Sequence, residues 1–107
     1  MTLWAQLTDA EREALVLDVI AGLEEAGVPL HLRAGLVRYF SDGILPGSFL
    51  QAVLCNNLEQ AVLRADPFSA FGLECLVRFL DACAPKGSWG SRENVLAWTT
   101  TPDRLEV

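Results

Sequence analysis

Apolar residues recur three and four positions apart along most of the chain, which is the spacing of amphipathic helices. The first run follows Thr8-Asp9-Ala10-Glu11, which fits a capping box, and stops at Gly27, a residue suited to a left-handed cap. A second run lies between Pro29 and Gly43 and gathers its apolar residues on one side. The pattern predicts one helix before Gly27 and another after it.

Two short helices are expected in the middle of the chain. Ser48, with a glutamine three residues later, makes a second capping box and predicts a helix from Phe49 to Asn56. Asn57 resembles a further cap, so residues 58–65 form either a separate helix or a continuation of the previous one through a kink.

The strongest start signal is Asp66-Pro67, an N-cap residue followed by proline at the first helical position. It predicts a helix from Pro67 to Ala84. Polar residues form only a narrow strip on this helix, and Phe68 and Phe71 fall on its apolar side. We therefore expect it to be the central and most buried helix.

No stretch of the chain alternates apolar and polar residues between turn signals, so no sheet is predicted. Ser91 can cap a last helix from Arg92 to Trp98. The chain thus predicts an all-α fold, a compact bundle of five or six short helices in a single domain over residues 1–107. Residues 1–7 and the polar tail 99–107 are expected to be flexible ends.

The composition bounds the environment of the protein. Hydrophobic residues make up 51% of the chain, so we expect surplus apolar surface that meets a partner or a second copy. No apolar run approaches the roughly 20 residues that cross a bilayer, and the start of the chain does not read as a signal peptide. Without paired cysteine spacing, the thiols are expected to stay reduced, which predicts a cytoplasmic protein.

Charge is concentrated in the first helix. The net charge is −6, and residues 1–27 hold six acids against one arginine. This balance argues against direct nucleic-acid binding, which depends on Lys and Arg. The acids form two predicted edges, which either steer a basic partner or are simply solvated: Glu11, Asp18 and Glu25 recur every seven residues, with Glu13 and Glu24 on another edge. Trp4 and Trp89 are candidate exposed anchors for such a partner.

Groups suited to catalysis or metal binding are few. His31 is the single histidine and is expected to lie on the surface. The cysteines lack the short paired spacings of a zinc site, and Cys75 and Cys83 fall on an apolar helix face. Cys55, beside a predicted helix break, is the thiol expected to reach solvent. We assign no catalytic residue, metal site or cofactor.

Residues 39–98 resemble a family of short proteins encoded by bacteriophages and plasmids. The family has no assigned activity, so the resemblance implies provenance. Relatives often have Asn-Asp-Leu where this chain has Asn56-Asn57-Leu58. The resemblance lies in Pro46-Gly47-Ser48-Phe49-Leu50, Ala52-Val53-Leu54, Asn56-Asn57-Leu58, Ala61-Val62, Arg64-Ala65-Asp66, Ala84-Pro85 and Ser88-Trp89-Gly90-Ser91.

The leading functional hypothesis is a small acidic protein of a phage or mobile element that binds a basic surface of a host protein without catalysis. An inhibitor of a host defence system, of the anti-CRISPR type, would act in this way in the host cytoplasm. One alternative is an accessory protein that forms a homodimer through its surplus apolar surface. Another is an enzyme with an unfamiliar site that uses Cys55 or His31.

Overall fold

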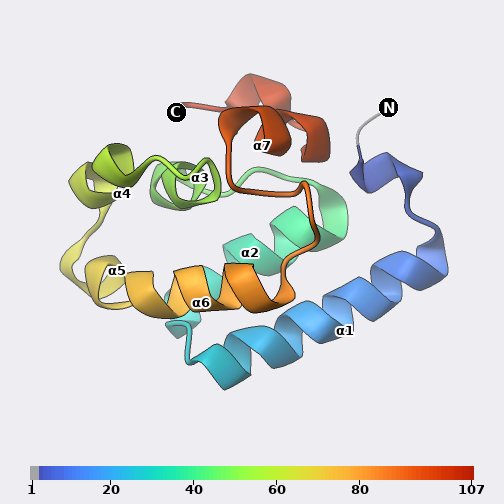
Figure 1. Ribbon diagram of the computed structural model, residues 1–107, viewed down its shortest axis with the longest axis horizontal. Coiled ribbons are helices and arrows are strands. Elements are labelled where there is room, and N and C mark those ends of the chain that lie inside the picture. The colour runs from blue at the N-terminus through green and yellow to red at the C-terminus, as the bar shows by residue number, and fades with distance from the viewer. Residues whose placement is uncertain (1–2) are drawn as a thin grey trace.

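Every regular element in residues 3–107, the part of the chain that the computed structural model describes, is a helix (Figure 1). The all-α fold is confirmed. The α-helices in this part number seven, one more than the upper end of the prediction. They are α1 (Asp9–Ala26), α2 (Leu30–Asp42), α3 (Ser48–Leu54), α4 (Leu58–Arg64), α5 (Pro67–Phe71), α6 (Leu73–Cys83) and α7 (Arg92–Trp98), with the 3₁₀ turns η1 (Trp4–Gln6) and η2 (Pro102–Arg104) near the two ends.

Side-chain caps set most of the helix starts where the sequence predicts them. The Thr8 hydroxyl accepts a hydrogen bond from the Glu11 N–H at 3.2 Å, and the Glu11 carboxylate accepts one from the Thr8 N–H at 3.0 Å. Gly27 ends α1 with a φ of 72°, the left-handed conformation that glycine adopts without strain. Three further predicted caps each accept a backbone N–H three residues on: Asn57, Asp66 and Ser91.

The start of α3 differs from the prediction. Gly47 is its N-cap and makes no side-chain hydrogen bond, while Ser48 is already helical. Gln51 does not complete a capping box, because its side chain lies in the interior with an exposed fraction of 3%. The expected cap was wrong because this glutamine bonds to segments distant in the sequence.

The predicted helix from Pro67 to Ala84 is two helices, α5 and α6, which meet at Gly72. A β-carbon at Gly72 would lie 2.5 Å from Cγ of Pro29, so the junction packs against the start of α2 only because this residue has no side chain. The break directs Phe68 and Phe71 outward, with exposed fractions of 75% and 89%. Their predicted place on a buried face is wrong.

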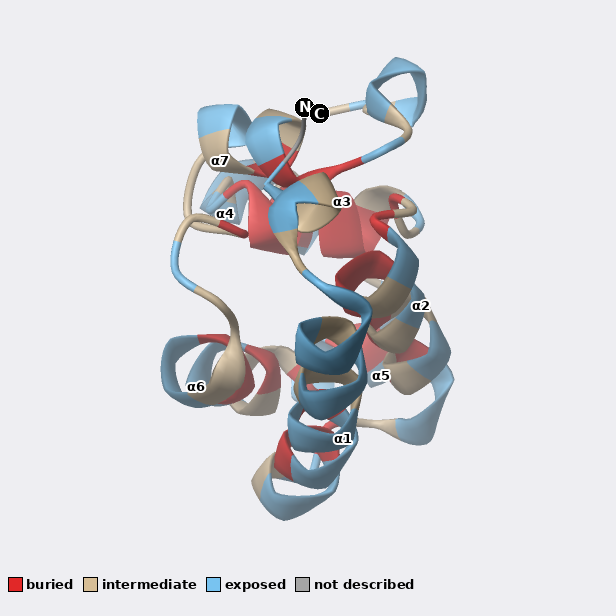
Figure 2. Cartoon of the chain, turned by 90° about the vertical axis from the view of Figure 1, so that its right-hand side faces the viewer, coloured by how far each residue is buried: buried red, intermediate tan, exposed pale blue. Residues whose placement is uncertain are grey.

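The core is centred on α3, where six of seven residues are buried. Helix α6 buries one side, so the prediction that this region is the most buried does not hold. Figure 2 shows the buried segments gathered on the inner sides of the helices. An aromatic cluster joins α2, α6 and α7 with ring centroids 5.1 to 6.4 Å apart, and its members are Tyr39, Phe40, Phe79 and Trp98.

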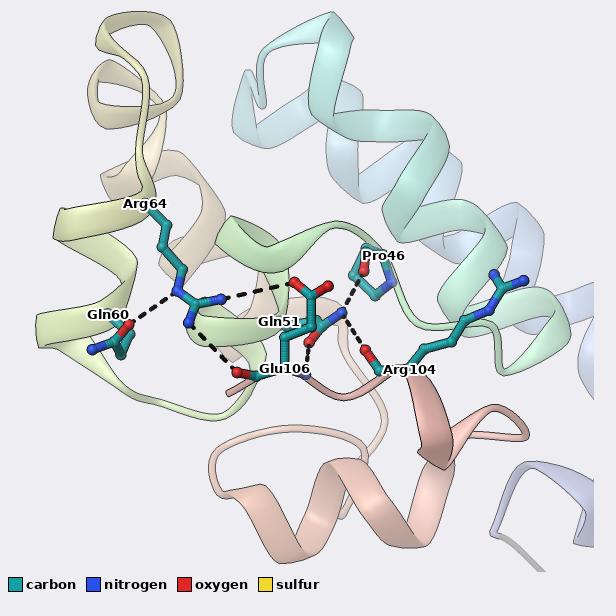
Figure 3. Close-up of polar contacts among 6 residues, drawn as sticks. All are labelled: Pro46, Gln51, Gln60, Arg64, Arg104 and Glu106. Atoms are coloured by element: carbon teal, nitrogen blue, oxygen red, sulfur yellow. Dashed lines mark hydrogen bonds and ion pairs between the residues drawn. The ribbon is translucent and has the colours of Figure 1, made fainter.

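The segment 99–107, expected to fray, packs against α2 and α3. Thr99 is fully buried and donates a hydrogen bond from Oγ1 to the Gly43 carbonyl at 2.7 Å. Further along, the Gln51 amide donates to the carbonyl of Arg104 at 3.1 Å and accepts from the Glu106 N–H at 2.7 Å (Figure 3). These hydrogen bonds fix the polar tail to the core.

The described part of the segment 1–7 also has specific contacts. The Leu3 N–H donates to the Ala97 carbonyl at 2.7 Å, which joins this segment to α7. Met1 and Thr2, which belong to the expected flexible end, lie outside the described residues. Within residues 3–107, no helix has the length and hydropathy needed for a membrane crossing.

Candidate functional site

Helix α1 lies along one edge of the molecule and packs against α2 and α6 (Figure 1). It is held from the inside by Val19 and Leu23, which are buried, and by Gly22, which lies against α6. The side of α1 turned away from α2 and α6 faces solvent. All five acids singled out in the sequence, Glu11, Glu13, Asp18, Glu24 and Glu25, are exposed there.

The exposed side of α1 is apolar along its middle and acidic along both margins. Successive helical residues are about 100° apart, so Glu13 and Glu24 fall on one margin. The row of Glu11, Asp18 and Glu25 falls on the opposite margin. Between the margins lies an exposed strip of Ala10, Ala14, Leu17 and Ala21. We call the strip with its two acidic margins the α1 outer face.

The carboxylates of this face are largely free of intramolecular partners. The ion pairs within residues 3–107 do not involve Asp18, Glu24 or Glu25. The Glu11 carboxylate accepts the Thr8 N–H of the cap, and hydrogen bonding with the backbone and side chain of Thr8 lowers the pKa of this carboxyl. Arg12, the one base within α1, points inward and stacks its guanidinium 4.0 Å from the centre of the Trp4 ring. The α1 outer face therefore carries a net negative charge.

Neither tryptophan proposed as an exposed anchor is fully exposed. Trp4 is half-buried, lies under Arg12, and donates from its indole Nε1 to the Ser41 carbonyl at 2.7 Å. Trp89 is also half-buried and packs against the core. Both side chains join parts of the fold to one another, so neither is as exposed as expected, and their contact with a partner stays a prediction.

Cys55 differs from the prediction. It is buried, with an exposed fraction of 8%, and burial raises the pKa of its thiol, which disfavours the nucleophilic thiolate. Cys75 and Cys83 are half-buried and pack against the core, in line with their predicted place on an apolar helix face. Cys55 is covered because the chain after α6 returns over the end of α3, where the Gly90 N–H donates to the Leu54 carbonyl at 2.7 Å. An enzyme based on Cys55 gains no support from this geometry.

His31 is exposed, as expected, and its Nε2 lies 3.2 Å from the hydroxyl of Ser69. This contact between α2 and α5 was not predicted. Ser69 is buried. Its N–H donates to the Asp66 carboxylate at 2.7 Å, and this hydrogen bond lowers the pKa of Asp66. The carboxylate thus caps α5, and the charge of His31 contributes to lowering its pKa. Among the described residues, no group of three or more His, Cys, Asp or Glu gathers as a metal site.

A second set of exposed apolar residues lies on α4, α5 and α6, of which α4 and α5 are on the side of the molecule away from η1 and the start of α1 (Figure 1). Six large apolar residues there are 46% to 89% exposed: Leu58, Val62, Leu63, Phe68, Phe71 and Val77. We call these residues together the α4–α6 face; Leu58 and Val77 line a common groove. A groove with a volume of about 70 Å³ opens on it between α4 and α6, with Ala61 and Leu73 among its lining residues. The sequence pattern missed this face because an uninterrupted helix would have buried both phenylalanines.

Comparison with known protein families, with curated proteins and with solved structures finds no match for this chain. Any functional conclusion therefore depends on the chemistry of the two exposed faces.

Proposed function

We propose that this protein binds a basic, helical segment of another protein through the α1 outer face and performs no catalysis. The observation that supports the proposal is the apolar strip of α1 between two margins of exposed carboxylates. Strips of this kind, flanked by charge, are typical of helix-to-helix recognition.

The strip provides close packing. Its alanines leave room for the backbone of a second helix, and Leu17, with an exposed fraction of 69%, supplies the largest apolar contact. Burial of these side chains would supply the short-range part of the binding energy.

The margins determine which helix can bind. Lys and Arg on both flanks of an incoming helix would lie beside the carboxylates, whereas acidic flanks would be repelled. A second copy of α1 is disfavoured at this face, because its acidic margins would meet acidic margins. The attraction acts over about 10 Å at moderate salt, so it accelerates encounter and is weakened by added salt.

The resemblance to phage- and plasmid-encoded proteins supports a partner that belongs to a host cell. We propose a host protein with a basic surface as the partner, bound in the host cytoplasm. Inhibition of a defence system, of the anti-CRISPR type, is the form that such binding would take if the bound segment is needed for that system's activity.

The proposal is tested with a synthetic helical peptide that has an Ala and Leu strip flanked by lysines, followed by fluorescence anisotropy across a salt series. We expect Glu11→Gln, Asp18→Asn and Glu25→Gln together to weaken binding at low salt by at least about tenfold and to flatten its salt dependence. Gln at residue 11 can still complete the capping box, so the start of α1 is retained.

The matched control neutralises three exposed acids outside the α1 outer face, Glu59→Gln, Glu93→Gln and Asp103→Asn. It removes the same net charge and should leave most of the affinity in place. Equal losses in the two triple variants would show a general charge effect and would reject the α1 outer face as the binding site.

A further inference from the structure

We infer that two copies of this chain associate through the α4–α6 face. This surface uses none of the residues of the α1 outer face, so the inference does not depend on the proposed function. Its exposed residues come from three consecutive helices, and the most exposed are Phe71 at 89%, Phe68 at 75% and Leu58 at 70%. Such a concentration of large apolar side chains is unusual on a surface that remains in water.

The extent of the face matches the requirement of a stable dimer. Burial of one Leu, Val or Phe side chain removes roughly 100 Å² of apolar surface from water, so the six residues offer on the order of 600 Å². Because about 65% of a homodimer interface is non-polar, this corresponds to roughly 900 Å² per copy. Standard interfaces bury about 800 Å² per partner.

The groove on this face has the size of a side-chain pocket. At about 70 Å³ it is far smaller than the roughly 300 Å³ at which small-molecule sites begin, but it can receive one aliphatic group. Leu58 and Val77 border it, and Asn56 and Asn57 supply a polar edge. An apolar centre with a polar rim is the usual organisation of a protein interface.

The charge on this face favours a second copy over a strongly basic or acidic partner. Residues 58–78 hold three acids and two arginines, so the face is close to neutral. One arginine, Arg78, is already paired with Glu74 at 2.8 Å. Two such faces can meet in a symmetric dimer without the repulsion that two acidic α1 helices would meet.

Analytical ultracentrifugation of the whole chain tests the inference, with Leu58→Asp compared with Leu17→Asp. The two leucines are matched, because their exposed fractions are 70% and 69%. We expect a concentration-dependent dimer, a dissociation constant raised at least about a hundredfold by Leu58→Asp, and little change with Leu17→Asp. Aspartate in the first turn of α4 favours the helix, so loss of the fold does not explain the effect.

Phe71→Ser provides a second variant whose side chain has almost no contacts to lose within one copy, and it should also weaken the dimer. A wild-type chain that stays monomeric up to about 1 mM would overturn the inference, because at that concentration even an association of about −4 kcal/mol is detected. Equal weakening by the two leucine variants would overturn it as well. Lysine-peptide binding measured on Leu58→Asp separates the two proposals, since it should match the wild type whatever the oligomeric state.

Discussion

The α1 outer face and the α4–α6 face are both exposed and apolar, yet the charges around them differ. The strip on α1 is enclosed by five carboxylates, whereas residues 58–78 carry nearly balanced charge. Exposed apolar surface shows that a contact is favourable, but the surrounding charge determines the kind of partner. One face therefore suits a basic helix and the other suits a copy of itself.

The two faces also differ in how the fold holds them in place. Helix α1 meets α6 where Gly22 lies against Cys83, while the junction of α5 and α6 meets α2 where Gly72 lies against Pro29. Both approaches need a glycine. Gly22 contacts the Cys83 side chain, which can rotate, whereas Gly72 contacts the rigid ring of Pro29.

Gly72→Ala should have the largest effect on stability. The new β-carbon would lie 2.5 and 2.7 Å from two ring carbons of Pro29, which cannot move without α2. We expect a loss of about 2–3 kcal/mol in the free energy of unfolding, measured by urea denaturation. Gly47→Ala is the control, because nothing lies within 4 Å of its added carbon, and it should stay within about 0.5 kcal/mol of wild type. Similar values for both variants would contradict the proposed role of the Gly72 contact.

Gly22→Ala should cost less, about 1–2 kcal/mol. Its added carbon would lie 2.6 Å from Sγ of Cys83, but that thiol can turn away, and alanine is the better residue inside a helix by roughly 0.5–1 kcal/mol. Cys83→Ala in the same chain should recover part of the loss in a double-mutant cycle measured by denaturation. Strict additivity of the two substitutions would show that the Cys83 thiol is not the obstacle.

The smallest effect concerns the caps that begin α1 and α5. Hydrogen bonds from the backbone and hydroxyl of Thr8 lower the pKa of Glu11, and those from Ser69 lower the pKa of Asp66. The unfolded chain therefore binds more protons, so the stabilisation is complete above the unfolded pKa values near 4 and is lost as pH falls through the folded ones.

Glu11→Gln with Asp66→Asn should accordingly have nearly the wild-type melting temperature at pH 7, because both replacements can still cap. Its melting temperature should fall less steeply than that of wild type as the pH is lowered from about 5 to about 3. Thermal melts followed by circular dichroism give this comparison. Parallel curves for the two proteins would mean that the two caps do not contribute to acid sensitivity.

Local interactions made much of this fold predictable. The caps at Thr8, Asn57, Asp66 and Ser91 bond three residues along the chain, so the sequence contains both partners of each bond side by side. The acidic margins of α1 were also readable, because their spacing follows the period of one helix. The apolar strip between them could have been found from the same spacing.

Features that depend on distant partners were not predictable in this way. The break at Gly72 depends on Pro29, and the interior position of Gln51 depends on Arg104 and Glu106. Likewise Cys55 is covered by a loop that arrives after α6. The α4–α6 face was not predicted because the break at Gly72 was not predicted. In an unbroken helix, Phe68 and Phe71 match the apolar side.

The bonds of Gln51 to the late segment 104–106 have a consequence for synthesis on the ribosome (Figure 3). Helix α3 emerges well before those residues, and until they follow, its buried amide finds only the Pro46 carbonyl inside the protein. In a nascent chain that ends before Arg104, the Gln51 amide of α3 would still be hydrogen-bonded to water. Closure of the domain therefore waits for residues 104–106, because it is set by contacts between residues far apart in the sequence.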